Sequence, residues 1–174
     1  AVVAYVSLPA DKSASIEIVN LFEPGDGDVL HFVETSFHVN ECVVNGQTVN
    51  FAQYLRSKGL DGGKLPLVGD FAGAHVNVSL QNIDDATGAV NLYAPVFAGV
   101  DYRFAKPVGD YAAAFRNRLA DVDSKGLVTG CNCILNFLYG ELEGKAIGGV
   151  QGPATFGEIA YQLLNQTMVT VRID

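Results

Sequence analysis

Short apolar runs separated by polar turns dominate the first hundred residues of the chain. Residues 15–22 alternate between apolar and polar side chains, as the residues of a half-buried strand do. Residues 1–8 and 29–39 are also strand-like, and the first of these runs is closed by Pro9. The pattern therefore predicts a β-rich N-terminal part that begins with a strand over residues 1–8.

A hairpin and a short helix follow in the predicted order. Asn45 and Gly46 stand between apolar runs, and Asn-Gly is the strongest short-range signal for a two-residue hairpin turn. Residues 50–58 form a predicted amphipathic helix, in which Asn50 is the N-cap and Gly59 ends the helix.

The middle of the chain predicts a β meander, and the last third begins with the clearest helix. Residues 109–122 place aromatic and aliphatic side chains at helical spacing, with Asp110 as the N-cap. A last strand is predicted over residues 168–173. The meander strands are expected over residues 65–70, 74–80, 89–97 and 100–104.

These elements predict an α+β fold with a largely antiparallel sheet of about eight to ten strands, arranged either as one unit or in two halves. Two main helices pack on that sheet in this interpretation. The length fits a single domain over residues 1–174, with a soft division near residues 61–64, where Gly62 and Gly63 interrupt the pattern.

The charge balance excludes some classes of partner. The chain has 19 acidic and 11 basic residues, a formal net charge of −8, and no cluster of basic residues. Nucleic-acid binding and attraction to an anionic membrane surface both need such a cluster, so neither partner is expected. Apolar residues make up 49% of the chain and charged residues 17%, a composition compatible with a homodimer.

The apolar runs, the cysteine count and the N-terminus indicate where in the cell the protein is expected. No apolar run reaches the roughly 18 to 20 residues of a membrane span. Three cysteines are too few for a disulfide framework, which favours a reducing, cytoplasmic compartment. The chain starts at Ala1 without methionine, so a cleaved leader upstream is compatible with the sequence.

Two of the cysteines, Cys131 and Cys133, lie two positions apart in the stretch LVTGCNCILNFL, so on a strand their thiols face the same side. Such a pair could bind a soft metal or form a strained disulfide. No further cysteine or histidine nearby completes a four-coordinate site, so the favoured interpretation is two buried strand cysteines. We therefore predict no metal and no cofactor.

Glu158 is the most informative charged residue, because Phe156 and Ile159 surround it with apolar side chains. A glutamate in such a setting points to solvent, caps backbone amides or meets a cationic ligand. Gly157 beside it allows another group to approach the backbone closely. Near the last strand, Asn165 and Thr167 are typical of a turn fixed by side-chain hydrogen bonds.

The order of motifs in the last fifty residues resembles the C-terminal part of the FIST family of sensory domains, found in bacteria and eukaryotes. The matching residues are Cys131, Gly148-Gly149, Gly157-Glu158 and Asn165-Gln166-Thr167. The resemblance implies a domain that binds small ligands such as amino acids and serves in signal transduction. The chain departs from the family in its shorter length and in a compact link between Glu158 and Asn165.

Taken together, the residues favour a small-molecule-binding or sensory domain that performs no chemistry of its own. Its predicted ligand site consists of Glu158, Gly157, Thr155, Asn165, Thr167 and Cys131, and Glu158 would meet a ligand amino group. Two alternatives stay open. One is a small enzyme that uses Glu158 or a cysteine in a cleft, and the other is a structural protein that forms a homo-oligomer.

Overall fold

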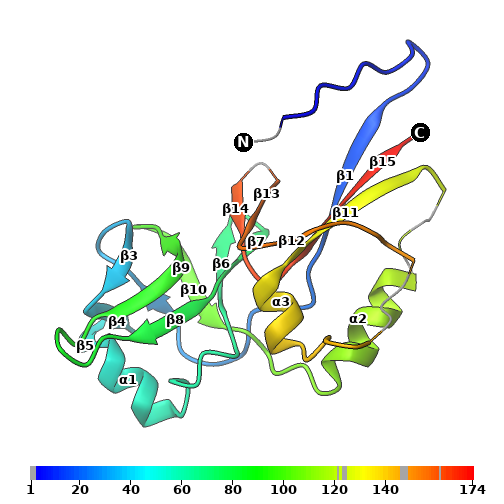
Figure 1. Cartoon of the computed structure of the whole chain (residues 1–174). Helices are drawn as coiled ribbons and strands as arrows, with labels where there is room; N and C mark the ends of the chain where they lie inside the picture. The colour runs from blue at the N-terminus through cyan, green and yellow to red at the C-terminus, as the bar shows by residue number, and fades with distance from the viewer. Residues whose placement is uncertain (1–2, 121, 123–124, 146–148, 161) are drawn as a thin grey trace.

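The computed structural model describes residues 3–120, 122, 125–145, 149–160 and 162–174. Within that part of the chain, three helices and fifteen strands form an α+β fold, as the sequence predicts (Figure 1). The strand pairs are antiparallel except for one parallel pair between β11 and β12. No helix among the described residues is long and apolar enough to cross a membrane.

The elements of the N-terminal half form a six-stranded sheet in the order β5-β4-β2-β10-β6-β7 and a three-stranded sheet in the order β3-β9-β8. Their bounds are β2 (Leu30–His31), β3 (Ser36–Val39), β4 (Glu41–Val44), β5 (Gln47–Asn50), α1 (Phe51–Lys58), β6 (Leu67–Phe71), β7 (Ala74–Val78), β8 (Leu80–Ile83), β9 (Val90–Val96) and β10 (Asp101–Phe104).

The other elements form a four-stranded sheet in the order β1-β15-β11-β12 and the two-stranded sheet β13-β14, with α2 and α3 beside the larger sheet (Figure 1). Their bounds are β1 (Ala14–Val19), α2 (Tyr111–Ala120), β11 (Leu127–Cys133), α3 (Ile134–Tyr139), β12 (Ala154–Thr155), β13 (Glu158–Ala160), β14 (Gln162–Leu164) and β15 (Met168–Ile173). The first strand therefore joins the sheet of the C-terminal elements, where it pairs with the last strand.

The N-terminal half is held by one large apolar core between its two sheets and α1. Tyr102 from β10, Phe51 from α1 and Phe32 lie at its centre, and the Phe32 ring meets the other two rings edge to face at 5.5 and 5.3 Å. Edge-to-face contacts between buried aromatic rings add to the stabilisation that burial provides.

The predicted hairpin and first helix are confirmed. Asn45 and Gly46 adopt positive φ between β4 and β5, as a tight hairpin turn requires. The Asn50 side chain accepts a hydrogen bond from the Gln53 amide at 2.9 Å and so caps α1. Gly59, with φ of 65°, ends the helix in the left-handed region.

A second core lies between the four-stranded sheet and α2. Phe115 and Leu119 of α2 pack there with Val19, Leu142 and Met168. The predicted helix over residues 109–122 is therefore confirmed in its position, with Asp110 accepting a hydrogen bond from the Ala113 amide at 2.9 Å. The first residues of α2, Tyr111 and Ala112, also line the cleft described below.

Two strand predictions are wrong. The described residues of the predicted strand over 1–8 form no strand, because no other segment pairs with them. The predicted strand over 29–39 is divided into β2 and β3, which belong to different sheets. The Ser36 hydroxyl donates to the His38 carbonyl oxygen at 2.7 Å and accepts from the His38 amide at 3.0 Å, and these local bonds fix the chain where it enters β3.

The strand expected around Cys131 and Cys133 is present as β11, which ends at Cys133. The apolar run that follows is the short helix α3, which the sequence analysis did not predict. The Asn136 side chain accounts for the helix at this point. Its NH₂ group donates to the side-chain oxygen of Asn132 at 2.7 Å, and its own side-chain oxygen accepts from the Tyr111 hydroxyl. Tertiary contacts here override the strand preference of the local sequence.

Candidate functional site

Glu158 is a buried carboxyl group in β13, with 4% of its surface exposed. Its Oε1 atom accepts a hydrogen bond from the Thr167 hydroxyl, while Oε2 makes no hydrogen bond of ordinary geometry. Burial raises the pKa of Glu158 to about 7, because a charged carboxylate loses its hydration there. The nearby hydroxyls of Thr167 and Thr155 and the Cys133 thiol lower the pKa, but by less than burial raises it.

The structure brings four of the six predicted site residues together. Thr167 and Thr155 face the Glu158 carboxyl group, and the Cys131 thiol lies 3.7 Å from the Thr155 hydroxyl. Cys133, which the sequence analysis did not include in the site, also lies beside the Glu158 carboxyl group and is fully buried. Burial raises the pKa of Cys133, and the charge of Glu158 raises it further.

The other two predicted residues have mainly backbone roles. Gly157 adopts φ of 140°, and a side chain there would approach Leu163 to 3.2 Å. Asn165 is fully buried and turned toward the N-terminal half, where its backbone carbonyl accepts from the Asn77 side chain at 3.1 Å. Its own side-chain oxygen faces the Ser79 amide at 3.5 Å.

Gln166 makes the strongest connection between the two halves. Its side-chain oxygen accepts from the Ser79 hydroxyl at 2.7 Å, and its side-chain nitrogen donates to the Lys64 carbonyl at 3.2 Å. The residue is buried and has a positive φ of 51°. The turn before β15 is thus a polar joint that holds β7, β8 and the segment before β6 against the last strand.

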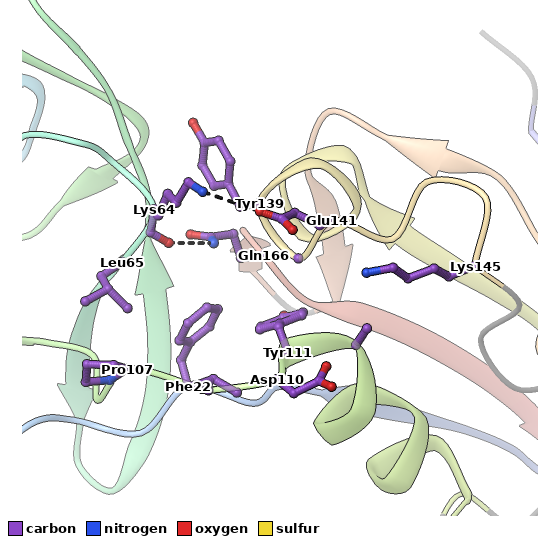
Figure 2. A pocket seen from close by; sticks show the side chains of 14 residues that line it. Phe22, Lys64, Leu65, Pro107, Asp110, Tyr111, Tyr139, Glu141, Lys145 and Gln166 are labelled. Carbon is purple, nitrogen blue, oxygen red and sulfur yellow. Dashed lines mark hydrogen bonds and ion pairs between the residues drawn. The ribbon is translucent and has the colours of Figure 1, made fainter.

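A cleft of about 380 Å³ opens beside this joint, between residues 64–65 and 107–109 on one side and α2 and the end of α3 on the other (Figure 2). Gln166 forms part of its lining, whereas Glu158 does not. The buried ring of Phe22 and the ring of Tyr111 give the cleft an aromatic wall, with their centroids 5.7 Å apart.

Two cations and two anions line the cleft. Lys64 and Glu141 form an ion pair at 3.6 Å near its mouth (Figure 2). On the other side, Asp110 caps α2, and Lys145 makes no ion pair with any described residue. A molecule that carries both charges would find an oppositely charged group for each of them.

The Tyr111 hydroxyl is used within the protein. It donates to Asn136, and this bond joins α2 to α3 at the floor of the cleft. Burial raises the pKa of the Tyr111 hydroxyl, so it remains neutral. The described residues contain no group of three or more histidine, cysteine, aspartate or glutamate side chains placed to hold a metal ion.

A model for one protein family matches residues 1–174, the entire chain. The chain belongs to this family. It is described as a family of unknown function (DUF6976). Neither a curated protein nor a solved structure gives a significant match to the chain.

Membership of DUF6976 overturns the resemblance to the FIST family. The single family model covers the last fifty residues as well as the first hundred, so the order of short motifs there was no mark of FIST ancestry. The structure gives these motifs other roles, since Asn165-Gln166-Thr167 forms the polar joint. Of the glycine pair, Gly148 lies outside the described residues.

The sequence analysis did not find the cleft, because its lining comes from five separate stretches of the chain. Phe22, Lys64, Tyr111 and Lys145 are distant in sequence and belong to no shared motif. The only local signal was the division near residues 61–64, which lies directly before one wall of the cleft. Clefts between packed units are common places for ligands.

Proposed function

We propose that this DUF6976 protein is a small-molecule-binding domain whose ligand is zwitterionic, like an amino acid, and occupies the cleft beside Gln166. The observation that supports this proposal is the combination of an aromatic wall with both signs of charge in one cleft. Its volume of about 380 Å³ falls within the range of roughly 300 to 1,000 Å³ that small-molecule pockets occupy.

Lys145 is the residue best placed to receive a ligand carboxylate. Its ammonium group makes no ion pair with a described residue, so binding would not require breaking one. The Glu141 and Asp110 carboxylates lie in the same lining and would favour a ligand amino group. A purely anionic or purely cationic ligand would meet repulsion from one of these pairs.

The aromatic wall would receive the apolar part of such a ligand. Phe22 is buried and held in place by Tyr111, whose ring stacks in turn on Phe115 at 6.1 Å. A surface fixed in this way loses little side-chain entropy when a ligand covers it. The ligand class that fits is therefore a small amino acid derivative with an apolar side chain.

The burial of Glu158 and Cys133 supports binding over catalysis at these two groups. Both side chains are almost entirely enclosed by the protein, so a substrate has no direct access to them. The raised pKa of Cys133 also disfavours the thiolate that a nucleophilic cysteine needs. The enzyme alternative would require an opening of the interior around β13.

The experiment is a thermal-shift screen with the natural amino acids and their N-acetyl and amide derivatives, followed by calorimetry for each compound that stabilises the protein. We expect stabilisation by a free amino acid but not by its derivative lacking one of the two charges. The Lys145→Met variant should weaken binding at least tenfold. The matched control is Lys12→Met, which removes an exposed lysine that does not line the cleft.

Two results would overturn the proposal. The first is that no compound in the screen raises the melting temperature of the wild-type protein. The second is that Lys145→Met and Lys12→Met bind equally well while Glu158→Gln abolishes binding, since this would place the ligand at the buried carboxyl group instead.

A further inference from the structure

The most exposed apolar segment of the described chain is residues 3–8, which we call the arm. Val3, Tyr5 and Val6 expose 67%, 96% and 72% of their surface. The arm carries no charge and forms no helix or strand. In Figure 1 the chain turns beyond the end of β1, and the arm (dark blue) runs back across the top of the view without joining a sheet. A run of large apolar side chains left in water in this way marks a surface for interaction.

The arm is followed, after a short turn, by a strand with a free edge. β1 is the outermost strand of its sheet, and among the described residues it pairs with β15 alone. Ser13 and Asp174 exchange both backbone hydrogen bonds, at 3.2 and 3.0 Å. Because antiparallel pairs alternate, the backbone groups of Ala14 and Ile16 point to the opposite, unpaired side of β1. Both residues are exposed, so the edge can accept another strand.

We infer that the arm pairs as a strand with the free edge of β1 in a second copy of this chain, forming a homodimer by mutual exchange. Every copy offers both an arm and a free edge, so one twofold arrangement satisfies both partners at once. Addition of an extended segment to an exposed sheet edge is a common mode of recognition, because backbone hydrogen bonds supply the affinity.

The side chains support the same pairing. In an extended arm, Val3 and Tyr5 lie on one face and Val6 on the other, so either face offers apolar contacts. Ile16 on β1 exposes 44% of its surface and would be covered by one of these side chains. The arm is also neutral, which suits contact between two copies that each carry a net charge of −8.

Pairing of the arm with β1 of its own chain is disfavoured by Pro9. The Lys12 amide donates to the Pro9 carbonyl at 3.0 Å and closes a turn between the arm and β1. A hairpin continued from this turn would begin with the pair Pro9 and Lys12. Because proline has no N–H group, Pro9 could not donate the second hydrogen bond of that pair. The edge is thereby left for the arm of another molecule.

The first test is the mass of the 174-residue protein in solution, measured by light scattering after size-exclusion chromatography. We expect a dimer for the wild type and loss of the dimer for the double variant Tyr5→Ser, Val6→Ser. Phe156→Ser is the matched control, since Phe156 is equally exposed, at 92%, but lies outside the arm and should leave the dimer intact. A monomeric wild type, or a double variant that stays dimeric, would overturn the inference.

The second test identifies the partner surface. A Tyr5→Cys chain is mixed with an Ile16→Cys chain under mild oxidation, with the wild-type protein as the control for its own three cysteines. A disulfide-linked dimer containing one of each chain is the expected product. A third chain carries both substitutions, Tyr5→Cys and Ile16→Cys. If this chain forms an internal disulfide while the mixture of single variants does not cross-link, the arm folds onto its own β1 and exchange is refuted.

Discussion

The side-chain amide of Gln166 donates to the backbone carbonyl of Lys64 across 3.2 Å, and the two residues are 102 positions apart. The same side chain accepts a hydrogen bond from Ser79, which is fully buried. Gln166, in the turn that precedes the last strand, therefore connects two segments of the N-terminal half to the sheet of the C-terminal elements. Gln166 and Lys64 both also line the cleft.

Replacing Gln166 with leucine should lower the free energy of unfolding by about 2 to 3 kcal/mol. The substitution keeps the size of the side chain but leaves the buried Ser79 hydroxyl without its acceptor and the Lys64 carbonyl without its donor. Urea denaturation measures the change. Gln47→Leu, at an exposed position, is the control and should change stability by less than about 0.5 kcal/mol. Equal effects of the two substitutions would show that the joint does not stabilise the fold.

The stability of the protein should fall as the pH rises between about 4.5 and 7, through Glu158. Its pKa is about 7 in the folded protein, against an ordinary value of 4.5. Within this window the unfolded chain releases the proton of Glu158 while the folded protein retains it, so higher pH favours unfolding. Below the window both states are protonated, and above it both are ionised, so the contribution is constant on either side.

Denaturation curves recorded from pH 4 to 8 on the wild type and on Glu158→Gln measure this effect. Allowing for partial solvent screening, the loss through Glu158 is on the order of 2 kcal/mol. The glutamine variant should lack this decline, because it cannot ionise. Glu34→Gln, at an exposed position, should retain it. A wild-type profile that matches that of Glu158→Gln would mean that Glu158 ionises normally in the folded protein.

Gly152→Ala should destabilise the protein by more than about 3 kcal/mol. A Cβ atom at this position would collide with the backbone of Gly130 in β11, just before β12 begins. The Gly130 amide donates to the Gln151 carbonyl at 2.9 Å, so the two backbones cannot separate without losing their pairing.

Gly149→Ala is the matched substitution, because a Cβ atom there meets no other atom within 4 Å. Thermal and urea denaturation of both variants measure the difference. A Gly152→Ala protein as stable as Gly149→Ala would show that the β11–β12 contact can open without cost.

The elements that the sequence predicted well are those determined by neighbouring residues. The Asn45-Gly46 turn and the Asn50 cap of α1 need only a few adjacent side chains and their preferred backbone angles. Glu158, by contrast, is buried, but not by the two apolar neighbours that drew attention to it, because Phe156 and Ile159 expose 92% and 78% of their surfaces. Thr167 and Cys133 from other elements lie against its carboxyl group instead. Its role as a ligand-binding residue stays a prediction.

The features that the sequence did not predict depend on distant contacts. Whether residues 3–8 pair as a strand depends on a partner strand elsewhere, which composition does not reveal. The helix α3 forms in a strand-like run because Asn136 meets Tyr111 from α2. The cleft likewise needs Lys64, Tyr111 and Lys145 to come together from three stretches of chain. The local pattern of apolar and polar residues does not indicate which distant residues come into contact.

The three cysteines should differ in their reaction with iodoacetamide in the native protein. Cys42 and Cys133 are buried, and burial raises the pKa of both thiols, that of Cys42 to about 12. Cys131 is half-buried and therefore more accessible. Because alkylation requires an accessible thiolate, we expect native labelling at Cys131 alone and labelling of all three in urea.

Mass spectrometry of the labelled peptides assigns each modification, and Cys131→Ser should abolish labelling of the native protein. Labelling of Cys133 at the rate of Cys131 would contradict the structure, since it would mean that the interior around Glu158 opens readily to solvent. That result would also favour the enzyme alternative, because it would give substrates access to a thiol beside a carboxyl group. Protection of Cys133 leaves the cleft beside Gln166 as the accessible site.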